Sequence, residues 1–176
     1  YTVPMTSTGY VRRDTKQALR MVNHNYISNQ IVSYDVYLLF REAFRGGNTH
    51  ANRFFSGQIL HNVKSYDRAS SYPDVQCNQL FPIAEFKRGE DTMQYITYLI
   101  KNNKPFVCRV AFDKIRLTDR LWPIPYLTKD KSRNIIDGLF DNGRILQAEH
   151  AETTVTDVDL KIILEEYSFD NIYVSD

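Results

Sequence analysis

The chain has 176 residues, of which 43% are apolar and 24% charged, a composition typical of a folded globular protein. Its 22 basic and 21 acidic residues leave a formal net charge of +1, which excludes a uniformly basic nucleic-acid-binding surface and requires any DNA-binding charge to be local. The sequence has no membrane-spanning apolar run, no signal peptide and no metal-ligand spacing at Cys77 or Cys108. We therefore expect a cytoplasmic protein with reduced thiols and no membrane partner.

Two helices are predicted in the first part of the chain. Residues 1–9 are rich in Ser, Thr, Pro and Gly and are expected to form a loop, followed by a helix over residues 14–23. Ser33 fits the N-cap of the second helix. That helix is expected to end at Gly46 and Gly47, because paired glycines have a backbone freedom that a helix does not use.

The middle of the chain is predicted to hold a short strand and another helix. Residues 62–67 favour a strand that ends on Asp67, and residues 68–82 favour a compact segment with Val75 in the core. Apolar residues at helical spacing predict a helix over residues 91–101.

The last third of the chain is predicted to be rich in strands. Residues 117–143 are rich in Pro, Lys, Arg and Asp, which indicates a long loop, and Thr156 with Asp159 resembles a capping box that opens a helix. Strands are expected at residues 106–113, 144–150 and 172–174. Because no βαβ rhythm is present, the pattern predicts an α+β fold with a largely antiparallel sheet and packed helices.

The stretch 65–73 carries the most informative chemistry. A strand would bring the carboxylate of Asp67 to its end, and the following turn would leave backbone N–H groups free, an arrangement that suits Mg²⁺ and a polyphosphate. The ring of Tyr72 could lie beneath a sugar. By themselves these residues favour a plainer interpretation, in which Asp67 caps a surface turn and Tyr72 belongs to the core.

A resemblance to a known motif favours the functional interpretation of this stretch over the plainer one. Asp67-x-x-Ser70-x-Tyr72-Pro73 resembles motif A of family B DNA polymerases, Asp-x-x-Ser-Leu-Tyr-Pro, with Ser71 in place of Leu. The resemblance implies that Asp67 binds the catalytic Mg²⁺ or Mn²⁺ ions. It further implies that Ser70 and Ser71 bind the triphosphate through backbone amides, and that Tyr72 packs on the deoxyribose and excludes a 2′-hydroxyl.

A second motif lies about twenty residues upstream. Phe44-Arg45-Gly46-Gly47 resembles the Tyr-x-Gly-Gly motif that joins the exonuclease and polymerase domains, and residues 48–52 are similar to its continuation in the protein-primed phage branch. The resemblance implies that these four residues contact the template DNA, the arginine neutralising a phosphate and the glycines permitting close approach. Phe44 replaces the tyrosine of the family, so a hydroxyl contact is lost there.

The two motifs together imply a piece of a larger polymerase. Residues 1–60 would be a linker and helical segment leading into the polymerase domain, and residues 61–176 a partial palm with an inserted loop region. The intact protein would carry out template-directed nucleotidyl transfer by two-metal catalysis, with a DNA template-primer and deoxynucleoside triphosphates as partners, in a bacterial host or as a prophage product. The sequence leaves two primers open, a terminal protein and a nucleic acid. The second carboxylate motif, Tyr-x-Asp-Thr-Asp-Ser, is absent from the sequence, so this chain alone is expected to be inactive.

Two other interpretations stay open. The chain could be a non-catalytic DNA- or partner-binding prophage remnant that kept residues 45–47, or an α+β domain whose motif matches are chance. A basic and aromatic cluster could contact single-stranded DNA, although a solvated loop is the favoured interpretation. The cluster consists of Lys129, Lys131, Arg133, Trp122 and Tyr126.

Overall fold

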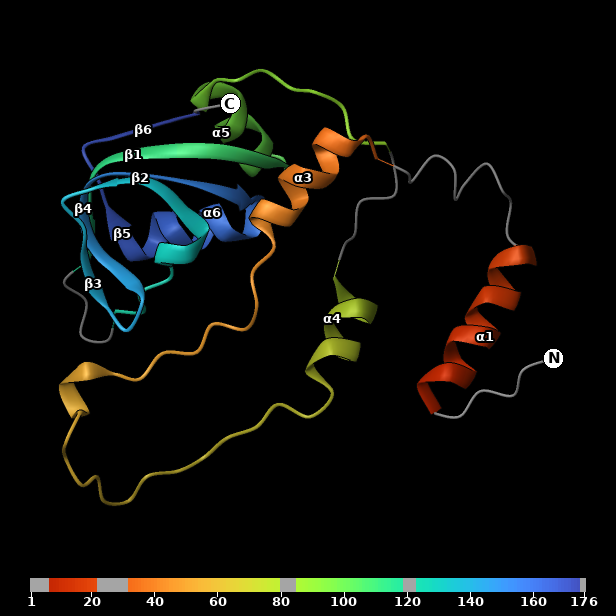
Figure 1. The fold of residues 1–176 in the computed structure, drawn as a ribbon, viewed down its shortest axis with the longest axis horizontal. Helices are drawn as coiled ribbons and strands as arrows, with labels where there is room; N and C mark the ends of the chain where they lie inside the picture. Colours follow the sequence, from red (N-terminus) through yellow and green to blue (C-terminus); the bar gives the residue numbers. More distant parts are fainter. Residues whose placement is uncertain (1–6, 22–31, 80–84, 119–122, 175–176) are drawn as a thin grey trace.

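The computed structural model describes residues 7–21, 32–79, 85–118 and 123–174 (Figure 1). A six-stranded antiparallel sheet lies at its centre. Its longest strands are β1 (Val107–Leu117) and β4 (Arg144–Thr156), which pair side by side. The shorter strands are β2 (Ser132–Ile136) and β3 (Leu139–Asp141), which pair with β4, and β5 (Tyr167–Ser168) and β6 (Asn171–Val174), which pair with β1. The predicted α+β fold with a largely antiparallel sheet is confirmed.

The core contains the inward side chains of β1 and β4 together with residues of two helices. These helices are α5 (Met93–Lys101), which contributes Ile96, and α6 (Asp157–Glu166), which contributes Leu160 and Ile163. Phe112, Ile115, Ile145, Leu160 and Ile163 are completely buried. Each such side chain stabilises the fold by about 1.5–3 kcal/mol relative to its exposed state, so this half of the chain has a core of its own.

Helix α3 (Tyr34–Ala43) is attached to the other face of the sheet by polar contacts. Its carboxylate Glu42 accepts hydrogen bonds from the Thr154 hydroxyl (3.0 Å) and from Arg133 Nη2 (2.6 Å), and Arg109 Nη2 lies 3.0 Å from it. Partial burial raises the pKa of Glu42, but the hydrogen bonds from Arg109 and Thr154 outweigh it and leave that pKa below its usual value. The end of α3 is thereby fixed over β1, β2 and β4.

Two capping predictions are confirmed. The Val36 N–H donates to Ser33 Oγ (3.4 Å), so Ser33 is the N-cap of α3, and a complete capping box between Thr156 and Asp159 opens α6. The predicted end of α3 is wrong. The helix ends at Ala43 because Phe44 adopts an extended conformation (φ −60°, ψ 123°), and the glycines follow in the loop.

Other predicted elements differ from the structure. Helix α1 (Ser7–Met21) begins inside the predicted loop, residues 62–67 form no strand, and Val75 lies in α4 (Ser71–Asn78) with 44% of its surface exposed. The predicted loop at residues 117–143 contains β2, β3 and the 3-10 turn η2 (Lys129–Lys131). A second 3-10 turn, η1 (Arg53–Phe55), interrupts the long connection between α3 and α4. None of the described helices has the length and apolar character needed to cross a bilayer.

Candidate functional site

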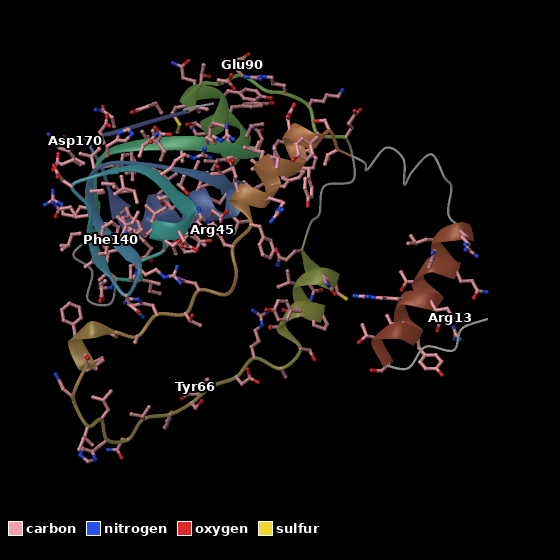
Figure 2. The ribbon with its side chains drawn as sticks, viewed as in Figure 1. Arg13, Arg45, Tyr66, Glu90, Phe140 and Asp170 are labelled. Carbon is pink, nitrogen blue, oxygen red and sulfur yellow. The ribbon has the colours of Figure 1, made fainter. Side chains whose placement is uncertain are left out.

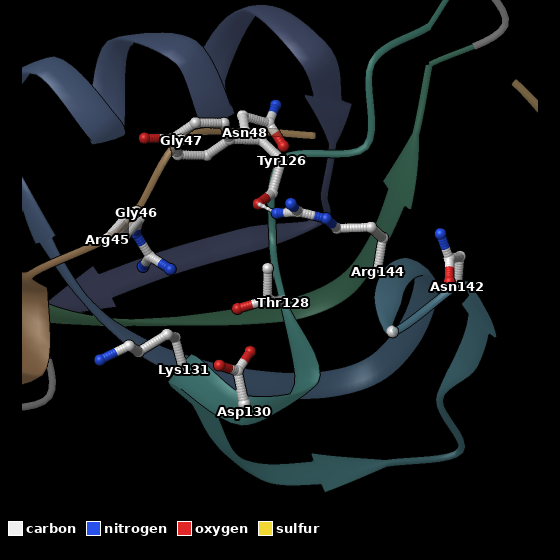
Figure 3. Close-up of a pocket in the computed structure, with 11 residues that line it drawn as sticks. Arg45, Gly46, Gly47, Asn48, Tyr126, Thr128, Asp130, Lys131, Asn142 and Arg144 are labelled. Carbon is white, nitrogen blue, oxygen red and sulfur yellow. Dashed lines mark hydrogen bonds between the residues drawn. The ribbon is translucent and has the colours of Figure 1, made fainter. Parts of the chain in front are cut away.

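A polar cavity of about 310 Å³ lies beside β4 (Figure 3). Three chain segments that are far apart in the sequence line it: residues 45–48 after α3, residues 126–131 before β2, and residues 142–144 at the turn into β4. The cavity therefore brings together the Arg45-Gly46-Gly47 motif and two members of the predicted basic and aromatic cluster, Lys131 and Tyr126. Trp122, another member of that cluster, lies outside the described residues.

The cavity lining carries more positive than negative charge. Arg45, Lys131 and Arg144 are its cations, and Asp130 is its one carboxylate. The neighbouring Thr128 side chain and the nearby charges of Lys131 and Arg144 hold the pKa of Asp130 below its usual value, so this carboxylate is ionised at neutral pH. Asp159, which lies outside the lining, balances Arg45, so two cations against one carboxylate leave the cavity with a net positive charge that suits an anionic ligand.

Neither Arg144 nor Lys131 makes an ion pair with a carboxylate of the described residues, although both lie near enough to Asp130 to lower its pKa. Arg144 Nη1 donates to the carbonyl of Tyr126 (3.2 Å) and Nη2 donates to the carbonyl of Thr49 (3.2 Å), which fixes the guanidinium without cancelling its charge. Lys131 makes no ion pair with any described residue. Next to Thr49, His50 Nε2 lies 3.5 Å from Asp141 Oδ2, which holds the 45–50 loop against the β3–β4 hairpin.

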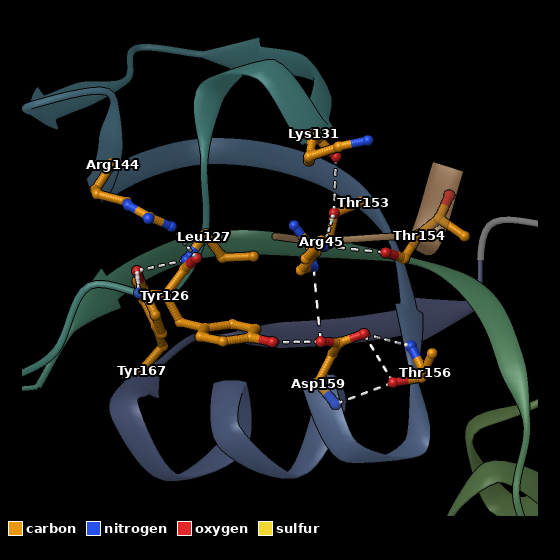
Figure 4. Close-up of polar contacts among 10 residues, drawn as sticks. All are labelled: Arg45, Tyr126, Leu127, Lys131, Arg144, Thr153, Thr154, Thr156, Asp159 and Tyr167. Carbon is orange, nitrogen blue, oxygen red and sulfur yellow. Dashed lines mark hydrogen bonds and ion pairs between the residues drawn. The ribbon is translucent and has the colours of Figure 1, made fainter. Parts of the chain in front are cut away.

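Arg45 has a different role, because its side chain is directed into the protein (Figure 4). Its Nη2 donates to Thr153 Oγ1 (2.8 Å) and to the carbonyl of Thr154 (3.0 Å), and its Nε lies 3.7 Å from Asp159 Oδ1. The guanidinium also lies over the ring of Tyr126, 5.7 Å from its centroid. With only 11% of the side chain exposed, Arg45 fixes the loop to the sheet rather than extending into solvent. Its Nε and Nη1 are buried without a hydrogen-bond partner in the described structure.

Asp159 connects this arginine to the start of α6. Its Oδ2 accepts from the Thr156 N–H (2.9 Å) and from the Thr156 hydroxyl (2.8 Å), while its Oδ1 accepts a short hydrogen bond from the Tyr126 hydroxyl. Burial, together with this hydrogen bond to a carboxylate, raises the pKa of Tyr126 well above its usual value, so the phenol stays protonated and donates. One buried carboxylate thus positions both Arg45 and Tyr126 in the cavity wall.

Tyr167 fixes the other side of the same wall. Its hydroxyl oxygen accepts from the N–H groups of Tyr126 (3.0 Å) and Leu127 (3.1 Å), and its O–H donates to the carbonyl of Ile145 (2.9 Å). Burial raises the pKa of Tyr167 to about 12, so the hydroxyl keeps its proton at physiological pH. The strand-like segment at 126–127 is thereby held against β4.

Gly46 and Gly47 form the bare part of the cavity edge. A Cβ atom added at either glycine would meet nothing within 4 Å, and neither has a positive φ. The packing of the chain therefore does not require glycine at these two positions. A molecule that approaches the backbone closely from outside would be a physical reason for both glycines.

The motif A-like residues lie elsewhere. Asp67 is exposed in an irregular segment, Ser70 adopts a left-handed conformation (φ 54°, ψ 37°) as the N-cap of α4, and Ser71 begins that helix. Tyr72 is 80% exposed, so the predicted core position for its ring is wrong. Figure 2 shows Tyr66, the neighbour of Asp67, on a segment that loops well clear of Arg45.

The structure therefore places the predicted DNA-contacting motif at the cavity and the motif A-like residues away from it. Arg45, Gly46 and Gly47 lie together at the cavity, preceded by Phe44, whose ring is 73% exposed. Asp67 and Tyr72 do not line this cavity. The described residues contain no group of three His, Cys, Asp or Glu side chains that could hold a metal ion, and Asp67 alone does not make a two-metal site.

Sequence reasoning missed Arg144, although a signal for its position was available. Asn142 and Gly143 have positive φ values of 47° and 74°, the pattern of the two central residues in a tight type I′ hairpin turn. An Asn-Gly pair between apolar stretches predicts such a hairpin. The hairpin would have placed Arg144 at the start of a strand, beside the turn. Thr153 and Asp159, by contrast, contact Arg45 across more than a hundred residues, and no local pattern marks them.

Comparisons with protein-family models, curated proteins and solved structures found no match to this chain.

Proposed function

We propose that this chain is part of a family B DNA polymerase of the protein-primed phage type, and that its cavity binds the phosphodiester backbone of template DNA. One observation carries the proposal: the Arg45-Gly46-Gly47 motif borders a cavity with two cations that make no ion pair, one carboxylate, and two glycines that the packing of the chain does not require. The motif resemblance and this geometry agree on the same ligand chemistry.

Each part of the cavity has a role in backbone binding. Lys131 and Arg144 supply positive charge that no carboxylate pairs in the described structure. Gly46 and Gly47 allow a sugar-phosphate chain to approach their own backbone closely. Arg45 is a positioning residue: its guanidinium is buried, its charge is balanced by Asp159, and it fixes the loop that carries the two glycines.

Catalysis would belong to the intact protein. In the proposed polymerase, Asp67 would supply one of the two carboxylates that hold Mg²⁺ or Mn²⁺, and the second would have to come from a part of the protein outside this chain. Ser70, Ser71 and Tyr72 bind the deoxynucleoside triphosphate, and the terminal protein supplies the primer. We therefore expect this chain alone to extend no primer, because two-metal transfer needs both carboxylates.

DNA binding by the chain tests the proposal. Fluorescence anisotropy of a labelled single-stranded oligonucleotide gives the association constant over a range of salt concentrations. The slope of log K against log salt is negative, and its magnitude is expected to decrease by about 1.4 when Lys131 and Arg144 are replaced by Ala, since each lost phosphate contact removes about 0.7 on a single strand. An Arg144→Lys variant, which keeps the charge, is expected to preserve the slope.

The matched control removes one lysine and one arginine elsewhere. Lys101 and Arg116 are both exposed and lie outside the cavity lining, so the double change to Ala at these positions is expected to leave the slope nearly unchanged. Equal slopes for the cavity variant and this control would show that the cavity does not contact DNA, and would overturn the proposal.

A second candidate function is a DNA-binding module without catalysis. The separation of Asp67 from the cavity favours it, because backbone binding would then need nothing from the motif A-like segment. The two functions differ in one result: the complete gene product extends a primer if it is a polymerase, whereas a binding module binds DNA with the same salt dependence and extends none.

A further inference from the structure

Helix α1 carries a concentrated positive charge. Its 15 residues include four basic side chains and one acidic side chain, which give the helix a net charge of +3, whereas the whole chain has +1. The basic residues are Arg12, Arg13, Lys16 and Arg20. The nearly neutral composition of the chain therefore conceals a strongly basic element.

The four cations share one side of the helix. Since successive residues of an α-helix are rotated by about 100°, they fall within an arc of about 100°, and Val11 and Ala18 lie on the opposite side. Arg12 and Arg20 are separated by about 12 Å along the helix axis at a rise of 1.5 Å per residue. The result is a narrow basic stripe along the helix.

This stripe is accessible. The four basic residues are all exposed, and Figures 1 and 2 show α1 apart from the sheet, with Arg13 labelled on it. Arg12, Lys16 and Arg20 make no ion pair with any described residue. Arg13 Nε lies 3.0 Å from Asp14 Oδ1, but both side chains are more than half exposed, so this pair holds its cation only weakly.

We infer that α1 is a second DNA-binding element, whose basic stripe lies along the phosphodiester backbone. This inference rests on the proposed function, which makes DNA the partner of the chain. Charge complementarity supports it, because every nucleotide of DNA carries one negative phosphate and the stripe presents four cations over about 12 Å. The contact is independent of sequence, since the long basic side chains of the stripe bind phosphates rather than bases.

A membrane surface is the other anionic partner that a basic helix fits. Helices that lie on membranes bury bulky apolar residues, such as Trp, Phe and Leu, on the side opposite their charges. In α1 that side carries Val11 and Ala18, the helix contains no Trp or Phe, and its one leucine, Leu19, lies beside the basic stripe, next to Arg12. The apolar side is therefore too small for stable membrane insertion, and nucleic acid is the favoured partner.

The test uses a triple variant, Arg12→Gln/Lys16→Gln/Arg20→Gln, because glutamine preserves helix propensity while it removes the charge. With the same single-stranded probe as above, the magnitude of the slope of log K against log salt is expected to decrease by about 2, and binding is expected to be at least about tenfold weaker at 0.1 M salt. The matched control, Arg12→Lys/Arg20→Lys, keeps the charge and is expected to keep the slope. Asp14→Asn, which frees Arg13 from its ion pair, is expected to increase the magnitude of the slope.

The outcomes separate this inference from the proposed function. If the cavity variant loses binding while the α1 variant keeps the wild-type slope, the inference is wrong and the proposed function stands. If only the α1 variant loses binding, the inference is supported and the cavity assignment is wrong. Absence of any DNA binding by the wild-type chain would overturn both. Charge-dependent binding of the wild-type chain to vesicles of anionic phospholipid, with an unchanged DNA slope in the triple variant, would overturn the inference in favour of a membrane partner.

Discussion

Asp159 is predicted to be the most sensitive polar residue of the cavity wall. Only 10% of its side chain is exposed, and its two oxygens serve Arg45, the Tyr126 hydroxyl and the Thr156 cap. An Asp159→Ala change leaves the Arg45 guanidinium buried without its counter-charge, and it also removes the acidic half of the capping box.

The expected loss follows from these two effects. Removal of one partner of a buried ion pair destabilises a protein by about 3–5 kcal/mol, and the 3.7 Å separation of Nε and Oδ1 places this pair at the lower end. Loss of the cap adds about 1 kcal/mol. The total of about 4 kcal/mol corresponds to a fall in Tm on the order of 10 °C for a chain of this length.

Urea unfolding followed by circular dichroism measures this loss, and a double-mutant cycle assigns it. Arg45→Met and Asp159→Asn are made singly and together, and we expect a coupling energy of about 1–3 kcal/mol because the two side chains are in contact. Additivity of the two changes within about 0.5 kcal/mol would refute the pairing of Arg45 with Asp159. The role of Arg45 as a positioning residue would fall with it.

Three further predictions concern individual side chains. The hydrogen bond to Asp113 raises the pKa of His150 above its ordinary value, so this pair stabilises the fold below about pH 6.5 and the stabilisation is lost as the pH rises through the raised pKa. The urea midpoint is therefore expected to fall between about pH 5.5 and 8.5, and to fall less in His150→Gln. Burial raises the pKa of Cys108 to about 12, whereas Cys77 is exposed, so iodoacetamide is expected to modify one thiol in the folded chain and two in urea, as counted by mass spectrometry. Tyr167→Phe removes the partner of two backbone N–H groups and one carbonyl, so it is expected to destabilise the chain by about 1–3 kcal/mol in urea unfolding, whereas Tyr98→Phe, at an exposed ring, is expected to change little.

Local interactions explain which parts of the fold the sequence could predict. The Ser33 cap and the Thr156–Asp159 box join residues three positions apart, so both are visible in a short stretch of sequence. The alternation in β1 predicts a half-buried strand for the same reason, because neighbouring residues alternate between its two faces.

Non-local interactions explain the failures. Only Val63 and Tyr66 favour a strand within residues 62–67, and a strand exists only where a partner supplies its ladder hydrogen bonds; no described strand pairs with this segment. The role expected for Arg45, neutralising a phosphate, differs from its ion pair with Asp159. Thr153, which accepts a hydrogen bond from Arg45, lies 108 positions after that arginine in the chain, so no local pattern indicates that the Arg45 side chain is directed inward.

The candidate site was predictable in part for a similar reason. The glycines and Lys131 were identified from motif and composition, whereas Arg144 required the recognition of a hairpin turn at Asn142 and Gly143. The meeting of these segments in one cavity depends on the pairing of β3 with β4, which is a property of the folded sheet.

Primer extension by the complete gene product tests the polymerase assignment most directly. The wild-type protein, Asp67→Ala and the control Asp91→Ala, at an exposed carboxylate paired with Arg88, are compared with a template-primer, deoxynucleoside triphosphates and Mg²⁺. We predict extension by the wild type and by the control, and none by Asp67→Ala. Extension by Asp67→Ala at the wild-type rate would contradict the assignment of Asp67 as a metal-binding carboxylate, and absence of extension by the wild type would contradict the proposed membership of this chain in a DNA polymerase.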